Sequence, residues 1–169
     1  MAIILALDMS STCIGWVLRA DQVLAYGAFD LPKSDIAQRC LAAQEMIERL
    51  IADRSIDAVA IESPVARFAK AVIPQARVSG AVLATLAARG LAWVEVTPSE
   101  GKMVLCEDGA ATKREMVEAA AQHFGYDVLH AAQRKGKWHG VSPMGAVYSE
   151  DTADALGIAL AAVGKVRIG

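Results

Sequence analysis

The sequence predicts an α/β fold with a mixed central sheet, in which an antiparallel meander is followed by parallel strands and helices flank the sheet. Apolar runs of strand length open the chain and recur in its middle, and runs with helical periodicity separate the later ones. Two Thr-x-x-Glu motifs mark helix starts. The chain has 169 residues, 54% of them hydrophobic, which suffices to bury the core of one domain. We therefore expect a single domain over residues 1–169.

The strands are expected where apolar runs end in turn-forming or charged residues. These runs are 2–8 (AIILALD), 13–19 (CIGWVLR), 23–31 (VLAYGAFDL), 55–62 (SIDAVAIE) and 91–96 (LAWVEV). Short turns join the first three runs, so they are predicted to pair antiparallel. Helical crossovers join the remaining runs, so their strands are predicted to lie parallel in the sheet.

Helices are expected from apolar spacing and from their end signals. Their predicted ranges are 36–51, 74–90 (opened by Pro74 and closed by Gly90), the segments begun by Thr97-x-x-Glu100 and Thr112-x-x-Glu115, and 150–163. The basic stretch from about 128 to 149 is predicted to be a loop, which is long for a compact domain.

Four carboxylates stand where these elements end. Asp8 ends the first strand, Glu62 ends the fourth, and Asp151 and Asp154 share one face of the last helix. Glu150 forms a competing pair with Asp154. If the helix start lies over the strand ends, the acids converge and repel one another. Hard divalent cations relieve such repulsion, so the pattern indicates an oxygen-ligand site for Mg²⁺ or Mn²⁺, with two ions able to hydrolyse a phosphodiester.

Each acid also has a purely structural interpretation. Asp8 is suited to capping the following turn, and Glu62 to accepting backbone hydrogen bonds. Asp151 favours the dipole of the helix that it begins. Asp154 is harder to explain in this way, because it interrupts an apolar, alanine-rich helix.

The charge is unevenly distributed over a chain with a formal net charge of −2. No acid lies between Glu62 and Glu95 or within 130–140 (HAAQRKGKWHG), whereas both stretches carry cations. A locally basic surface that binds nucleic acid is therefore compatible with the acidic total.

Other classes of protein are disfavoured by the composition. No uninterrupted apolar run reaches the eighteen or so residues of a membrane span, and we expect neither a membrane partner nor a signal peptide. Cys13, Cys40 and Cys106 are odd in number and scattered, which favours neither disulfides nor a zinc site. A reducing, cytoplasmic setting is expected.

The order of motifs resembles the RuvC family of Holliday junction resolvases, which have a ribonuclease H-like fold. The resemblance is carried by LALDMSSTCIGWVL (5–18), DAVAIESP (57–64), FAKAVIPQARVSGAVL (68–83), TPSEGKMVLCEDGAATKREMV (97–117) and DTADALGIALA (151–161). It implies a homodimer that cuts two opposed strands of a four-way junction and leaves 5′-phosphate and 3′-hydroxyl ends. It also implies two Mg²⁺ ions, with Mn²⁺ as a substitute, held by Asp8, Glu62, Asp151 and Asp154. Glu150 has no counterpart in the family.

The resemblance also implies DNA contacts. Phe68, flanked by Arg67 and Lys70, matches the segment that meets DNA near the junction centre, where stacking on a base contributes about 1–3 kcal/mol. Lys113 matches a family lysine near the scissile phosphate. The candidate DNA-binding residues are Arg67, Phe68, Lys70, Arg77, Lys102, Lys113, Arg134, Lys135 and Lys137. The structural alternatives are that Phe68 packs in the core and that the lysines are solvated on the surface.

Two features leave questions open. The segment 128–149 is longer than in the family, and its Trp138 and His139 suit either a DNA contact or a disordered surface loop. The predicted helix 74–90 has small residues four positions apart, Gly80 and Ala84, on one face. This face suits either a subunit contact or packing on the chain's own sheet.

Other activities compete with this hypothesis. A broader endonuclease for flaps and forks fits equally well. The opening hairpin also resembles actin-like sugar kinases and chaperone ATPases, although the chain lacks their second phosphate loop. A third possibility is a non-catalytic DNA-binding module.

Overall fold

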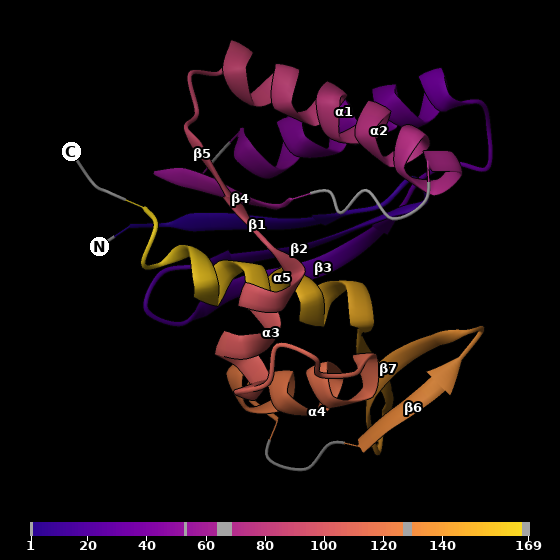
Figure 1. Cartoon of the computed structure of the whole chain (residues 1–169), viewed down its shortest axis with the longest axis vertical. Helices are drawn as coiled ribbons and strands as arrows, with labels where there is room; N and C mark the ends of the chain where they lie inside the picture. Colours follow the sequence, from indigo (N-terminus) through magenta and orange to yellow (C-terminus); the bar gives the residue numbers. More distant parts are fainter. Residues whose placement is uncertain (1, 53, 64–68, 127–129, 167–169) are drawn as a thin grey trace.

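The structure is a computed structural model that describes residues 2–52, 54–63, 69–126 and 130–166. Its centre is a five-stranded sheet of order β3-β2-β1-β4-β5 (Figure 1). The strands are β1 (Ile4–Met9), β2 (Cys13–Arg19), β3 (Val23–Asp30), β4 (Ala58–Glu62) and β5 (Trp93–Val96). β1, β2 and β3 pair antiparallel, whereas β4 runs parallel to both β1 and β5. The predicted mixed sheet is confirmed.

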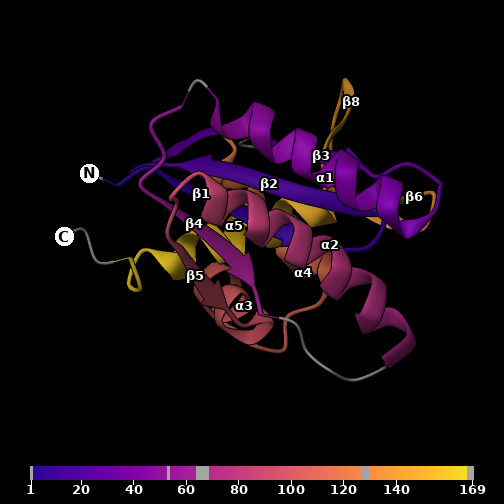
Figure 2. The same ribbon diagram turned by 90° about the horizontal axis from the view of Figure 1, so that it is seen from above.

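Helices cover both faces of this sheet. α1 (Ile36–Ile51) and α2 (Ala69–Ala88) lie over one face, and α5 (Glu150–Ala162) lies over the other (Figures 1 and 2). α3 (Pro98–Cys106) and α4 (Lys113–His123) pack outside α5. Among the described residues, no helix has both the length and the apolar character that crossing a membrane requires.

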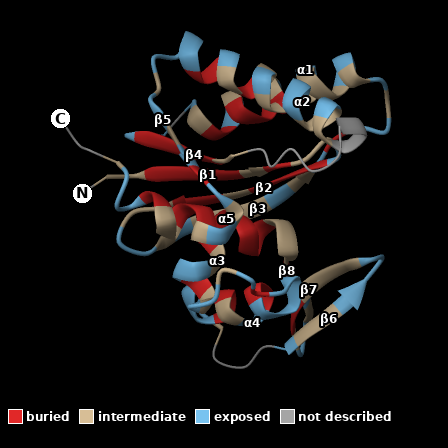
Figure 3. Cartoon of the chain, viewed as in Figure 1, coloured by how far each residue is buried: buried red, intermediate tan, exposed pale blue. Residues whose placement is uncertain are grey.

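The alternation of side chains along the strands divides the core into two clusters. In β1, Leu5 and Leu7 pack with the residues of α1 and α2, whereas Ile4 and Ala6 pack with those of α5. The buried residues accordingly form bands on both sides of the sheet (Figure 3). Because both faces are covered, the strands read as continuous apolar runs in the sequence.

α2 begins earlier than its sequence signal predicts. Pro74 lies inside the helix, five residues after its first residue, rather than at its start. A proline there removes the hydrogen bond to the carbonyl of residue 70, but its φ angle is compatible with a helix. The fully buried Val78, Val82 and Leu86 anchor the helix beyond this point.

The predicted loop at 128–149 is wrong, because its described part forms a second sheet. β6 (His130–Arg134), β7 (Lys137–Ser142) and β8 (Gly145–Ser149) pair antiparallel, beside α4 (Figure 1). Lys135 and Gly136 turn the first hairpin with φ angles of 50° and 80°, as a two-residue type I′ turn requires. The hairpin was missed because its strands are polar and basic, and Val141 and Tyr148 are the only large apolar side chains buried in β7 and β8.

Both predicted capping boxes are confirmed. In α4 the Thr112 side chain accepts a hydrogen bond from the Glu115 amide at 3.3 Å, and the Thr112 amide donates to Glu115 Oε2 at 2.7 Å. Thr97 and Glu100 form the same reciprocal pair at the start of α3. These caps satisfy amide groups that have no partner within the helix.

We predict that Thr112→Ala lowers the free energy of unfolding by about 1 kcal/mol, because the first turn of α4 loses its cap. Thr112→Ser keeps the hydroxyl group and should retain most of the stability. Urea unfolding followed by circular dichroism measures both variants, and equal losses for alanine and serine would contradict a capping role.

Candidate active site

Two neighbouring parallel strands place Asp8 beside Glu62. Leu7 of β1 pairs with Ile61 of β4. The residues that follow this pair, Asp8 in β1 and Glu62 in β4, are therefore neighbours. The alternation along each strand directs both carboxylates toward the face that α5 covers. The parallel pairing of β1 and β4 thus brings the ends of the two strands side by side.

The first turn of α5 reaches Asp8 because β2 carries a glycine there. Gly15 is the cross-strand partner of Asp8. A Cβ atom at Gly15 would lie 2.1 Å from the carbonyl oxygen of Asp151, a distance that no side chain tolerates. The missing side chain thus lets Asp151 lie against β2. Sequence reasoning overlooked Gly15, although a glycine inside a strand signals the close approach of another backbone.

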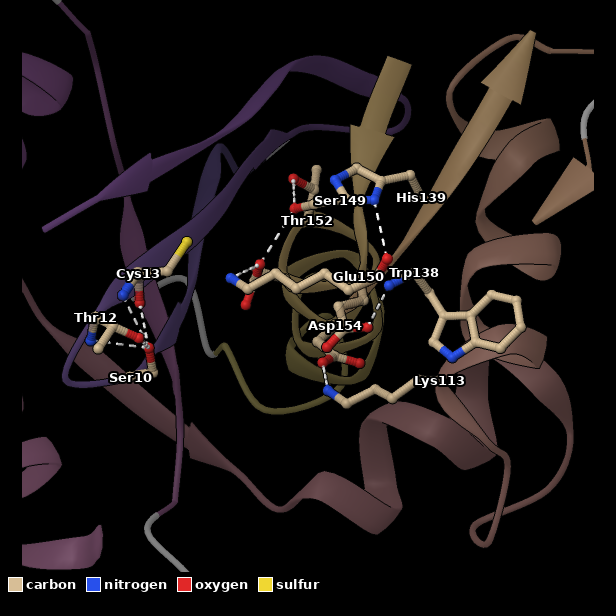
Figure 4. Close-up of polar contacts among 12 residues, drawn as sticks. Ser10, Thr12, Cys13, Lys113, Trp138, His139, Ser149, Glu150, Thr152 and Asp154 are labelled. Carbon is tan, nitrogen blue, oxygen red and sulfur yellow. Dashed lines mark hydrogen bonds and ion pairs between the residues drawn. The ribbon is translucent and has the colours of Figure 1, made fainter. Parts of the chain in front are cut away.

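Asp151 and Asp154 of α5 each contact a lysine from another element. Asp154 is buried, at 8% exposure, and pairs with Lys113 from the first turn of α4 (Figure 4). Asp151 Oδ2 accepts a hydrogen bond from Lys137 Nζ at 2.7 Å and another from Ser149 Oγ at 3.3 Å. The two carboxylates are therefore held by cations from two different elements, α4 and β7.

The charges of these groups act on one another. Burial, followed by the negative charge of Glu62 and a smaller effect of Asp151, raises the pKa of Asp8 to about 7. The ammonium groups of Lys113 and Lys137 oppose this rise. Asp8 thus stands in a concentration of negative charge that two lysines offset only in part.

Glu62 is affected in a similar way. Burial raises the pKa of its carboxyl group, and the charges of Lys113 and then Lys102 act against the increase. Lys102 lies on α3, so α3 as well as α4 contributes positive charge near the strand ends. Lys113 pairs with Asp154, and its charge also opposes the rise in the pKa of Asp8 and of Glu62.

The chemistry of these donors fits a hard divalent cation, because all are carboxylate oxygens and because like charges surround Asp8. Within the described ranges 2–52, 54–63, 69–126 and 130–166, however, no three His, Cys, Asp or Glu side chains are grouped so as to hold a metal ion. Lysines hold Asp151 and Asp154 instead. The carboxylates match the chemistry of a hard-cation site, but their side chains are not gathered around a single point.

Glu150 is engaged away from this acid group. Its Oε2 accepts a hydrogen bond from the backbone amide of Trp138 at 2.7 Å, which ties β7 to the first residue of α5 (Figure 4). Nδ1 of the His139 ring lies 3.1 Å from the carbonyl oxygen of Lys137. Trp138 and His139 therefore belong to an ordered strand rather than to a disordered loop.

The second sheet borders a groove beside the acids. It has a volume of about 520 Å³ and is lined by Cys13, Ala28, Asp30, Arg134, Lys135, Lys137, His139, Ser149 and Asp151. Three of the candidate DNA-binding residues thus share one wall, which the β6–β7 hairpin provides. Arg134 and Lys135 are exposed there.

Four further candidate DNA-binding residues belong to α2 and to the segment that precedes it. Arg77 is exposed on α2. Lys70 lies in the same helix, but its side chain is outside the described part of the structure. Arg67 and Phe68 also lie outside the described residues. Their proposed contacts stay predictions.

The architecture defines a class of protein, the ribonuclease H-like fold. RuvC of Thermus thermophilus, solved in complex with a Holliday junction substrate, is 19% identical with a TM-score of 0.74, covering 96% of this chain and 93% of that one. Yeast mitochondrial Holliday junction resolvase Ydc2 is 9% identical with a TM-score of 0.62, covering 95% of this chain and 77% of that one. At these identities the likeness establishes the fold.

The family follows from the sequence. Residues 5–136 match the profile described as "Crossover junction endodeoxyribonuclease RuvC". The chain therefore belongs to the RuvC family of metal-dependent, junction-resolving nucleases, as the motif resemblance predicted. This membership decides against the actin-like ATPase and the non-catalytic module. The profile ends in the β6–β7 hairpin, so Asp151 and Asp154 follow the matched region.

We predict that Gly15→Ala disrupts the site, because its Cβ would collide with the Asp151 backbone. Stability should fall by about 1–3 kcal/mol, as in other overpacked positions, and junction cleavage should fall with it. Gly109→Ala is the matched control, since its Cβ would make only ordinary contacts from 3.5 Å outward. Urea unfolding and a cleavage assay check both variants, and a fully active, stable Gly15→Ala protein would contradict the packing argument.

Proposed function

We propose that this chain resolves four-way DNA junctions by paired nicks in two opposed strands, leaving 5′-phosphate and 3′-hydroxyl ends. Two Mg²⁺ ions, replaceable by Mn²⁺, would be held by Asp8, Glu62, Asp151 and Asp154. The observation that carries the proposal is the charge on Asp8, whose pKa rises to about 7 through burial and neighbouring carboxylates. Such a group is stabilised by a divalent cation.

Each residue has a distinct task in this proposal. The bound ions would supply an activated water and stabilise the leaving oxygen of the phosphodiester. Asp8 and Glu62 are fixed by the sheet, and Asp151 and Asp154 by the first two turns of α5. Lys113 is anchored by its capped helix and lies among these acids, where its ammonium group suits a contact with the scissile phosphate.

Paired nicking calls for two active sites, and we propose a homodimer. Gly80 and Ala84 of α2 are both exposed, and a Cβ atom at Gly80 would meet nothing within 4 Å. This face therefore supports a subunit contact better than packing on the chain's own sheet. We also propose that residues 1–169 act as one nuclease domain, since both the first strand and the last helix supply acids to the same site.

We predict that Asp8→Asn lowers cleavage by at least about 10³-fold, because it removes a charge that metal binding requires. Binding of the junction should persist, since Asp8 offers little DNA contact. Asp21→Asn, in the exposed turn between β2 and β3, is the matched control and should cleave normally.

The assay compares four-way junctions, flaps, forks and duplexes, with Mg²⁺ and Mn²⁺ varied separately. Cleavage of junctions alone supports the resolvase, whereas equal cleavage of flaps and forks supports the broader branched-DNA endonuclease. Full activity of Asp8→Asn in Mg²⁺ would reject the metal-site assignment.

We predict that Lys135→Asn weakens DNA binding and lowers the slope of log K against log salt concentration by about 0.9, the value for one phosphate contact. Asparagine favours the left-handed conformation that Lys135 adopts, so the hairpin turn should remain intact. Arg49→Gln on α1, over the opposite face of the sheet from α5, serves as the control. Fluorescence anisotropy over a salt series measures both, and an unchanged slope for Lys135→Asn would remove the hairpin from the DNA interface.

A further inference from the structure

The β6–β7 hairpin holds the start of α5 through two consecutive residues. Lys137 Nζ lies 2.7 Å from Asp151 Oδ2, and the Trp138 amide donates to Glu150 Oε2 at 2.7 Å. The Asp151 side chain is 15% exposed and that of Lys137 is 37% exposed. The ion pair is therefore partly shielded from water, and a backbone hydrogen bond keeps its lysine in place.

Lys137 lies where negative charge from two elements favours a cation. Its charge acts on Asp8 as well as on Asp151, so it offsets repulsion between acids of β1 and α5. A second donor, Ser149 Oγ, contacts the same Oδ2 atom. Both hydrogen bonds go to Oδ2, so a metal ion bound by this carboxylate would lie beside the ammonium group of Lys137, and the two cations would compete for the same negative charge.

We propose that Lys137 is a positioning residue that competes with the divalent ion for Asp151 and so sets the metal affinity of the free enzyme. The proposal rests on the proposed function in one respect, namely that Asp151 is a metal ligand. It assigns to the second sheet a role besides DNA binding: the hairpin carries an internal counter-ion for the site.

The test measures Mn²⁺ binding directly, in the whole protein without DNA, by the electron paramagnetic resonance signal of free Mn²⁺. Lys137→Met should bind Mn²⁺ about fivefold more tightly, as expected when a partly exposed ion pair no longer competes. Lys137→Arg retains the positive charge and should restore the affinity of the unmodified protein.

A matched control separates competition from a general change in charge. Lys135→Asn removes a cation from the same hairpin but leaves the Lys137–Asp151 pair in place, so it should change Mn²⁺ affinity much less. An equal gain in both variants would overturn the proposal, because it would show a diffuse electrostatic effect. Unchanged or weaker Mn²⁺ binding by Lys137→Met would overturn it as well.

Asp151→Asn distinguishes failure of this inference from failure of the proposed function. If Mn²⁺ affinity falls in Asp151→Asn but Lys137→Met shows no gain, Asp151 is a ligand without a competing lysine, and only the inference fails. If Asp151→Asn leaves Mn²⁺ affinity unchanged, Asp151 is not a ligand, and both fail. The Mg²⁺ concentration for half-maximal junction cleavage gives a second readout, which should be lower for Lys137→Met than for Lys137→Arg.

Discussion

The contact between the first turn of α5 and the backbone of β2 brings the acids into one region. Gly15 leaves the space that the Asp151 peptide fills, and its cross-strand partner is Asp8. Glu62 adjoins Asp8 on the other side through the parallel pairing of β1 and β4. A meander, a crossover strand and the last helix thus meet at one point, and the absence of a single side chain makes that meeting possible.

The partly buried carboxylates are stabilised by lysines from three neighbouring elements. Lys113 comes from α4, Lys137 from β7, and Lys102 adds its charge from α3. Burial alone would otherwise favour the neutral carboxyl groups, as the raised pKa of Asp8 shows. In the proposed function the same lysines would also attract an anionic substrate, so one set of charges would serve both the stability of the site and DNA binding.

The outer helices contribute by keeping these cations in position. α3 and α5 approach closely where Gly101 meets Gly157, since a Cβ atom at Gly157 would lie 2.9 Å from the Gly101 carbonyl oxygen. The capping boxes define where α3 and α4 begin, and Lys113 is the first residue of α4. Local hydrogen bonds at Thr112 are thereby linked to the charge balance around Asp154.

The amino-acid sequence by itself determined the central sheet, both capping boxes and the four candidate acids. These features depend on local rules, namely apolar periodicity, short turns and Thr-x-x-Glu spacing, which neighbouring residues specify. The sequence also placed the chain in its family through motifs in their order. The sequence was misleading at Pro74, which predicted the start of a helix but lies inside α2. Proline is common at helix starts, but a helix also accepts it about one turn further in when buried residues anchor the rest of the helix.

Only the tertiary structure decided that 130–149 forms a sheet and that Lys137 holds Asp151. The β6–β7 hairpin has few buried residues of its own, so its apolar pattern is too weak to identify strands, and its pairing depends on α4 and α5. The partner of each lysine was equally beyond the sequence, since ion pairs such as Lys113 with Asp154 join residues that are distant along the chain. Local patterns specify elements, but contacts between elements follow from how they pack.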